Sequence, residues 1–377
     1  MNKKEISEIR RRFNPDYENI GHIYGCYVNA AKEIVSYMDM SCALMDKSER
    51  EMYLKLMKKS LSGTLGRNLL NIEVSSEEEG HRMLQALRKT SLRDENVRNI
   101  FFDAVIEHLD MGDSSYVILL ASDSYDVPFK GGDEEFLEDS SDEVFDYFVC
   151  AICPVKDAKA ALSYQADEQS FRGGCLGHIL APPEAGFMFP AFDDRCANIH
   201  NLLYYSRNTA SLQDTFIKEL FNARKVPMSA GAQKNIFSAI LSDALTDSCS
   251  IDVVASVHEQ LREKIQIHKE SKEPYAPEIY LDDMDEILKA NGIPEEKIND
   301  FSQSIEKHFG DNPALNPENL IESRKYELTT PEVKIKVNPE VAGRITTRII
   351  DGCSYILIPA GEGVEVNGID ITINKEI

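Results

Sequence analysis

The chain has 377 residues, a length that as a prior corresponds to two or three domains. Its hydrophobic fraction of 42% lies in the globular range, so the sequence can build a packed core. The formal net charge of −23 argues against a general binder of polyanions, since such a surface repels nucleic acid and anionic membranes. No apolar run approaches the ~20 residues of a membrane helix, and residues 1–12 lack the apolar middle of a signal peptide. We therefore expect a cytoplasmic protein with no membrane partner and with its 8 cysteines reduced.

The first part of the chain predicts a mixed α/β domain over residues 1–205. It opens with a short basic helix, because Ile6 and Ile9 share one stripe and Asn14-Pro15 ends the helical pattern. A hairpin, a helix, a pair of helices and two buried strands are expected next, at residues 22–28 with 34–39, 48–60, 75–109, 116–121 and 145–153.

The second part predicts helices and then hairpins. Residues 182–190, rich in Pro and aromatic side chains, are interpreted as a connection to a helical region over 206–270. The charged, Pro-containing segment 271–279 predicts a linker. In residues 280–377 we expect a helical pair followed by antiparallel hairpins, because two sites, Asp351-Gly352 and Asn367-Gly368, each lie between apolar runs. The predicted class is α+β, with a mixed α/β N-terminal domain, a helical middle, and a C-terminal helical pair plus antiparallel β segment.

Cysteine and histidine spacing gives a weak indication of metal binding. Cys150 and Cys153 lie three apart in an apolar strand, so their thiols face opposite sides and cannot share a metal or a disulfide. Two further Cys/His pairs have the sequence spacing of zinc ligands within each pair. They are Cys175 with His178 and Cys196 with His200. The number of residues between the two Cys/His pairs matches no known spacing of metal ligands. We therefore expect no bound metal and no other cofactor.

One polar cluster is a candidate site. Asp193, Asp194 and Arg195 follow an apolar stretch, and paired carboxylates at a strand end can hold a metal or perform acid–base chemistry. Neighbouring side chains usually diverge, however, so a turn or an ion pair is the structural alternative. Residues 62–67 predict a turn, because they lack the Gly-Lys-Ser/Thr ending of a phosphate loop. We find no other catalytic motif and favour a protein that is not an enzyme.

The N-terminal helix carries a positive net charge, whereas the chain as a whole is strongly negative. Its cations, which could contact nucleic-acid phosphate or an acidic partner, are Lys3, Lys4, Arg10, Arg11 and Arg12. The alternative is that its arginines pair with carboxylates of the same chain. Lys3 and Arg10 are seven residues apart and share one side of a helix, which allows two or three phosphate contacts. Any direct DNA binding should therefore be weak and not sequence-specific.

Several segments together carry a resemblance to known proteins. The segments MNKKEISEIRRRFNPD, IYGCYVN, LSGTLGRN, SYDVPFK, LAPPEAGFMFPAFDDR, HKESKEP and GVEVNGI resemble an uncharacterised family of Firmicute bacteria, a domain of unknown function. This resemblance covers nearly the whole chain and implies a bacterial cytoplasmic setting. The order of elements is also similar to that of the YejK-type nucleoid-associated proteins, where residues 100–121 and 145–154 correspond to a helix and two central strands. That second likeness is one of fold and implies no residue roles.

From these observations we expect a non-enzymatic, nucleoid-associated-like or interaction protein whose partner is a protein or a nucleoid component. Two alternatives stay open: a metal-dependent enzyme built around Asp193, Asp194, Cys196 and His200, and a scaffold whose acidic face docks basic partners. No oligomeric state is predicted.

Overall fold

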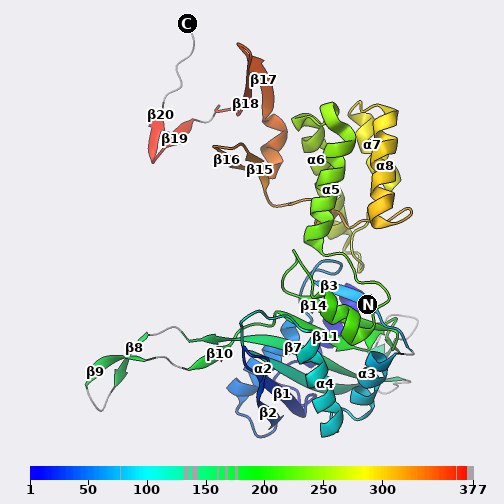
Figure 1. Ribbon diagram of the computed structural model, residues 1–377, viewed down its shortest axis with the longest axis vertical. Coiled ribbons are helices and arrows are strands. Elements are labelled where there is room, and N and C mark those ends of the chain that lie inside the picture. The colour runs from blue at the N-terminus through cyan, green and yellow to red at the C-terminus, as the bar shows by residue number, and fades with distance from the viewer. Residues whose placement is uncertain are drawn as a thin grey trace. The chain divides into compact units, whose positions relative to one another are not determined.

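The computed structural model describes residues 1–76, 78–130, 136–137, 143–158, 161–165, 169–174, 177–361 and 363–371. The chain divides into two compact units (Figure 1). Unit 1 comprises residues 1–231 and 274–276, and unit 2 comprises residues 232–273 and 277–377. Helices and antiparallel sheets are both present, which confirms the predicted α+β class.

An antiparallel sheet forms the centre of unit 1. Its strand order is β2-β1-β4-β7-β11-β14-β3, and β10 pairs with β7 outside that path. The strands are β1 (His22–Val28), β2 (Ile34–Ser41), β3 (Leu69–Glu73), β4 (Tyr116–Val127), β7 (Glu143–Asp157), β10 (His178–Leu180), β11 (Ala185–Phe189) and β14 (Asn201–Ser206). Shorter pairs are β5 (Phe129–Lys130) with β6 (Phe136–Leu137), β8 (Ala161–Gln165) with β9 (Ser170–Gly174), and β12 (Ala191–Asp193) with β13 (Cys196–Asn198).

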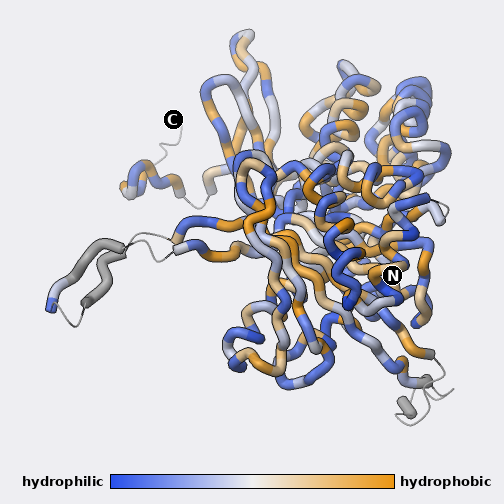
Figure 2. The backbone as a smooth tube through the Cα atoms, turned by 60° about the horizontal axis from the view of Figure 1, so that its bottom comes forward, coloured by the Kyte–Doolittle hydropathy of each residue, from blue (hydrophilic) through white to orange (hydrophobic). Residues whose placement is uncertain are grey.

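Both faces of this sheet are buried, which explains why its central strands are continuous apolar runs. Alternate side chains enter separate cores: Ile118 lies in one and Leu119 in the other. In Figure 2 these central strands are orange, the hydrophobic end of the scale. The first core is covered by α3 (Glu79–Lys89), α4 (Glu95–His108) and the π-helix η1 (Phe216–Leu220), and the second by α1 (Lys3–Arg12) and α2 (Lys47–Lys59).

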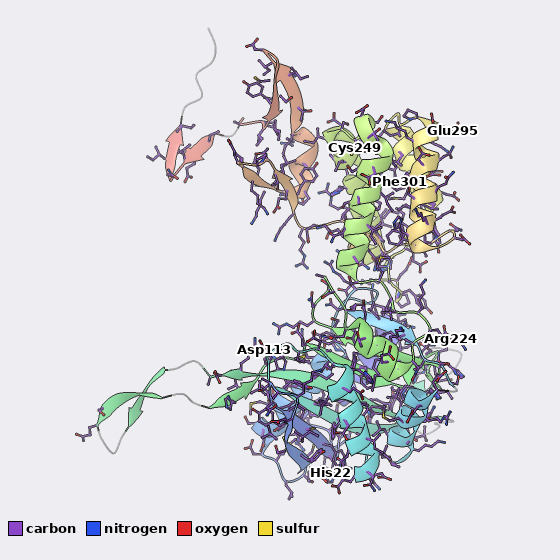
Figure 3. All side chains as sticks on the ribbon, in the orientation of Figure 1. His22, Asp113, Arg224, Cys249, Glu295 and Phe301 are labelled. Carbon is purple, nitrogen blue, oxygen red and sulfur yellow. The ribbon has the colours of Figure 1, made fainter. Side chains whose placement is uncertain are left out.

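Unit 2 has a helical core of its own. Phe301 of α8, labelled in Figure 3, packs edge-on against Phe237 of α5 with ring centroids 6.2 Å apart. Leu261 of α6 is fully buried in the same core. The helices are α5 (Ala230–Leu245), η2 (Thr246–Ser248), α6 (Ile251–Ser271), α7 (Leu281–Ala290), α8 (Glu295–Phe309), α9 (Pro317–Leu320) and η3 (Pro339–Arg344).

Three two-stranded hairpins complete the described part of unit 2. They are β15 (Tyr326–Thr329) with β16 (Lys334–Val337), β17 (Thr346–Ile350) with β18 (Cys353–Leu357), and β19 (Val364–Val366) with β20 (Ile369–Ile371). Asp351 and Gly352 both have positive φ, as do Asn367 and Gly368. These are the left-handed pairs that two-residue hairpin turns require, and both predicted hairpins are confirmed.

The structure corrects one sequence interpretation and refines others. Residues 182–190 are not a simple connection, because they contain β11, a fully buried strand between β7 and β14. The apolar strands predicted at 116–121 and 145–153 are confirmed as parts of the longer β4 and β7. Contacts group residues 232–273 with 277–377, a grouping that differs from the predicted segments 206–270 and 280–377. Whether those segments fold apart stays a prediction.

Candidate functional site

The predicted polar cluster forms the turn of the β12–β13 hairpin. Asp193 pairs with Cys196 across the two strands, which leaves Asp194 and Arg195 as a two-residue loop. Both loop residues have positive φ, 49° and 63°, a conformation that costs energy for a side chain other than glycine. Contacts with α1 hold the turn in this conformation.

Glutamates of α1 bind this turn. Glu5 is buried; it completes the capping box of α1 by accepting a hydrogen bond from the Asn2 N–H, at 2.6 Å, and it accepts another from the Asp194 N–H at 2.9 Å. One turn further along, both carboxylate oxygens of Glu8 accept from the Arg195 guanidinium, at 2.9 and 2.7 Å. The acidic side of the basic helix is therefore joined to the predicted site by charge-assisted bonds.

Asp193 has local partners. It accepts from Asn198 Nδ2 at 2.8 Å and from the amino group of Met1. Asp193, Asp194 and Arg195 are thus brought together, but their contacts fasten α1 to the β12–β13 hairpin. Among the described residues, no group of three or more His, Cys, Asp and Glu side chains is arranged to hold a metal ion.

A second polar network lies at the C-terminal end of α1. Arg12 donates two hydrogen bonds to Asp123 of β4, at 2.8 and 3.1 Å, and its guanidinium lies 4.8 Å from the ring centroid of Tyr125. Tyr147 of β7 donates to the same carboxylate at 3.0 Å. The Asp123 side chain is only 1% exposed, so its charge depends on these donors. Burial opposes the charge on Arg12, yet the hydrogen bonds and the charge of Asp123 outweigh it and raise the pKa of Arg12.

The five predicted cations therefore differ in environment. Arg12 pairs with a carboxylate of the same chain, as the alternative interpretation expected. Arg10 is half-buried, whereas the other three, Lys3, Lys4 and Arg11, are exposed. Lys4 and Arg11 are seven residues apart and share one side of α1.

The cysteines and histidines show no common site within the described residues. Cys175 lies outside them. His178 faces Asp157 at 3.0 Å, and His200 Nδ1 lies 2.9 Å from the hydroxyl of Ser76. Cys150 and Cys153 belong to different cores, which confirms that their thiols face opposite sides of β7.

A groove between α2 and β10 was not predicted from the sequence. It has a volume of about 600 Å³ and lies wholly in unit 1. Met52 and Ile179 line it and are 59% and 53% exposed, unusually high for large apolar side chains placed together. The full lining is Glu49, Met52, Tyr53, Lys55, Leu56, Lys59, Ile179, Leu180 and Pro182.

The local sequence explains the α2 wall of this groove. Asp46 caps the helix by accepting from the Glu49 N–H at 2.8 Å, and Leu54 and Met57 are buried beneath it. Exposed Met52 lies one helical turn from Leu56, which is partly buried against the second core, so the apolar surface of α2 continues outward to Met52. The spacing of Met52 and Leu56 is the sequence feature that indicated an apolar surface on this side of α2. The opposite wall of the groove, Ile179 to Pro182, comes from a distant part of the chain.

These features define the class of the molecule: an α+β protein with a helix-covered antiparallel sheet, an apolar surface groove and a second, helix-rich unit. The chain belongs to the family described as Domain of unknown function (DUF4317), which it matches over residues 1–369. A comparison with curated proteins gives no match. The likeness to the YejK-type proteins is not shown by these comparisons. Within the part of the chain that the structure describes, no helix is long and apolar enough to cross a membrane.

Proposed function

We propose that this protein is a non-enzymatic interaction protein that binds an amphipathic helix of a partner protein in the groove between α2 and β10. The observation that carries the proposal is that Met52 and Ile179, both exposed, line the same largely apolar groove. Apolar grooves of this kind receive the apolar face of a helix at positions spaced i, i+3, i+4 and i+7.

Charge at the groove indicates the chemistry of the partner. Lys55 and Lys59 line it, and only Glu49 contributes a carboxylate. This excess of cations stands out on a chain of net charge −23. A partner helix that carries carboxylates beside its apolar stripe would complement both features. The helical form follows from the shape of the wall, because the ridge of Met52 and Leu56 can pack beside a second helix.

The test uses a labelled amphipathic peptide with Leu at the spaced positions and Glu beside them, titrated by fluorescence anisotropy into the full chain. Two control peptides replace Glu with Lys, or the Leu stripe with Ser. We expect the Leu/Glu peptide to bind most tightly. The variant Met52→Asp/Ile179→Asp should weaken binding by about tenfold or more, since central apolar contacts are each worth about 1–2 kcal/mol.

Ile100→Asp is the matched control variant. Ile100 lies on α4, is 61% exposed and does not line the groove. It should leave peptide binding unchanged. Equal binding of all three peptides, or equal weakening by the Ile100 and groove variants, would contradict the proposal.

A nucleoid component remains a second candidate partner, supported by the exposed positions of Lys4 and Arg11 on one side of α1. Because Arg12 is engaged by Asp123, direct DNA contact through this helix would use these two cations. A salt titration of fluorescent duplex binding, with Lys4→Ala/Arg11→Ala as the variant, tests that candidate separately.

A further inference from the structure

Unit 2 contains a concave surface that the proposed function does not use. It has a volume of about 670 Å³, within the range of small-molecule sites, and lies where α6 begins beside the segment that leads into β15. Cys249, labelled in Figure 3, marks the approach to α6. The lining residues are Lys234, Cys249, Ser250, Ile251, Val254, His258, Glu322, Lys325, Tyr326, Glu327 and Leu328.

Two polar groups in this pocket lack hydrogen-bond partners among the described residues. Tyr326 is 6% exposed, yet its hydroxyl makes no hydrogen bond there; the contact of its ring is with His258, edge-on at 5.8 Å between centroids. The imidazole of His258 likewise makes no hydrogen bond within the described chain. The residue Tyr326 is buried as a whole, but its hydroxyl is not among the enclosed atoms and lies in the lining of the pocket, so it is free to donate a hydrogen bond to a bound molecule.

The charges around the pocket favour an anion. Lys234 and Lys325 both line it. One of its two carboxylates, Glu327, is already neutralised by Lys334 at 2.6 Å. The pocket also includes the N-terminus of the 21-residue helix α6, where Ser250 accepts from the Val253 N–H at 3.3 Å. The other N–H groups of a first turn have no partner within their helix, and they favour negative charge.

We propose that this pocket binds a small organic anion, a carboxylate or a phosphate monoester on an aromatic body. The anionic group lies at Lys234, Lys325 and the start of α6. The body packs against Val254, Leu328 and the two rings, and the Tyr326 hydroxyl donates a hydrogen bond to the ligand. This site is independent of the groove in unit 1, so either proposal can fail without the other.

The state of His258 adds a second readout. Burial, together with the positive charges of Arg262 and Lys234, lowers the pKa of His258 to about 4, so the imidazole is neutral at pH 7. The further titratable groups around the pocket are Asp252 of the same helix and, in the lining, Cys249, Glu322, Lys325, Tyr326 and Glu327. A bound anion favours the imidazolium and therefore raises the pKa of His258. Affinity should then increase as pH falls from neutral and level off below the pKa of the free protein.

The experiment titrates the full chain with phenyl phosphate, benzoate and the neutral benzyl alcohol, followed by NMR of histidine and tyrosine side chains. We expect both anions to bind and to shift the His258 and Tyr326 signals, and benzyl alcohol to bind at least about tenfold more weakly. The tighter anion identifies the headgroup. Benzenesulfonate, which does not titrate in this range, serves for the pH series.

Matched variants separate the ligand contacts from structural roles. Lys234→Gln and Lys325→Gln should each weaken anion binding about tenfold. Lys307→Gln, an exposed lysine on α8 outside the pocket, should leave it unchanged. Tyr326→Phe should weaken binding while leaving the denaturation midpoint unchanged, because the hydroxyl has no hydrogen-bond partner among the residues that the structure describes. Equal binding of benzyl alcohol and the anions, or a loss of binding in Lys307→Gln as large as in the pocket variants, would overturn the assignment.

Discussion

The buried ion pair between Arg12 and Asp123 gives the most quantitative prediction. Asp123→Ala removes a carboxylate that accepts three hydrogen bonds, two from Arg12 and one from Tyr147. Both donors then remain in a water-poor site without their acceptor. Breaking a buried pair in this way costs roughly 3–5 kcal/mol. Because the Arg12 side chain is 23% exposed and can reach water, we expect the lower end, about 3 kcal/mol.

A control pair isolates the effect of burial. Lys47 and Asp16 are as close, at 2.7 Å, but their side chains are 69% and 62% exposed. Asp16→Ala should therefore leave the opening free energy of unit 1 nearly unchanged, because solvent screens an exposed pair. The difference between the two variants compares a buried carboxylate that accepts three hydrogen bonds with an exposed one that accepts a single bond from Lys47.

Hydrogen exchange with mass spectrometry is the appropriate assay, because the chain lacks Trp and contains two compact units that need not unfold together. Peptides from β4 and β7 report on unit 1, and peptides from α6 to α8 report on unit 2. In Asp123→Ala the opening free energy should fall for the first set only. The double variant Arg12→Ala/Asp123→Ala should cost clearly less than the sum of the single variants. A loss below about 1 kcal/mol, or additive costs, would refute the reasoning.

Four further predictions follow from the structure. Maleimide should label the exposed Cys196 and Cys353 before Cys26 and Cys150, because burial raises the pKa of both buried thiols, that of Cys26 to about 12; peptide mapping gives the order. Duplex DNA binding should be weak, with a salt slope of about −1.8 for two phosphate contacts, and should be lost in Lys4→Ala/Arg11→Ala. Protease cleavage within residues 271–279 should leave the two fragments associated on gel filtration, because α6 packs against α7 and α9. Protein purified without chelator should contain no stoichiometric metal by elemental analysis.

Each of these has a contrary outcome. Early labelling of Cys150 would mean that the sheet opens readily. A salt slope unchanged by the Lys4/Arg11 variant would move DNA contact to another surface. Fragments that separate after cleavage would show that residues 280–377 fold independently, as the sequence-based boundaries predict. One zinc per chain would support the enzyme alternative.

The secondary-structure elements that were predictable from the sequence are those determined by neighbouring residues. The β4 and β7 strands were predictable because a strand buried on both faces leaves a continuous apolar run, and the two C-terminal turns because Asp-Gly and Asn-Gly favour left-handed pairs. The segment around β11 misled the interpretation, since Pro182 and Pro190 suggested a loop. In the structure both prolines lie just outside the strand, Ala185–Phe189.

The sites depended on contacts that no local pattern encodes. The helix of Lys3–Arg12 was predictable, but Asp123 lies 111 residues from Arg12 in sequence and has no local signal as its partner. The same holds for the groove, whose walls come from α2 and from residues 179–182. Tyr326 and His258 also meet only through tertiary packing, so the pocket in unit 2 was not predicted.

The edge strand β3 can take its place in the sheet only late in the synthesis of the chain. Among the described strands of the sheet, β3 pairs with β14, and Ile72 cannot pair until Leu202, about 130 residues later, has emerged from the ribosome. At ordinary elongation rates that delay is on the order of ten seconds. During this time the apolar side chains of Leu69–Glu73 have no native strand beside them. A nascent chain arrested before residue 201 should therefore be a good substrate for chaperones, whereas one arrested well after Ser206 should already resist protease in its first unit.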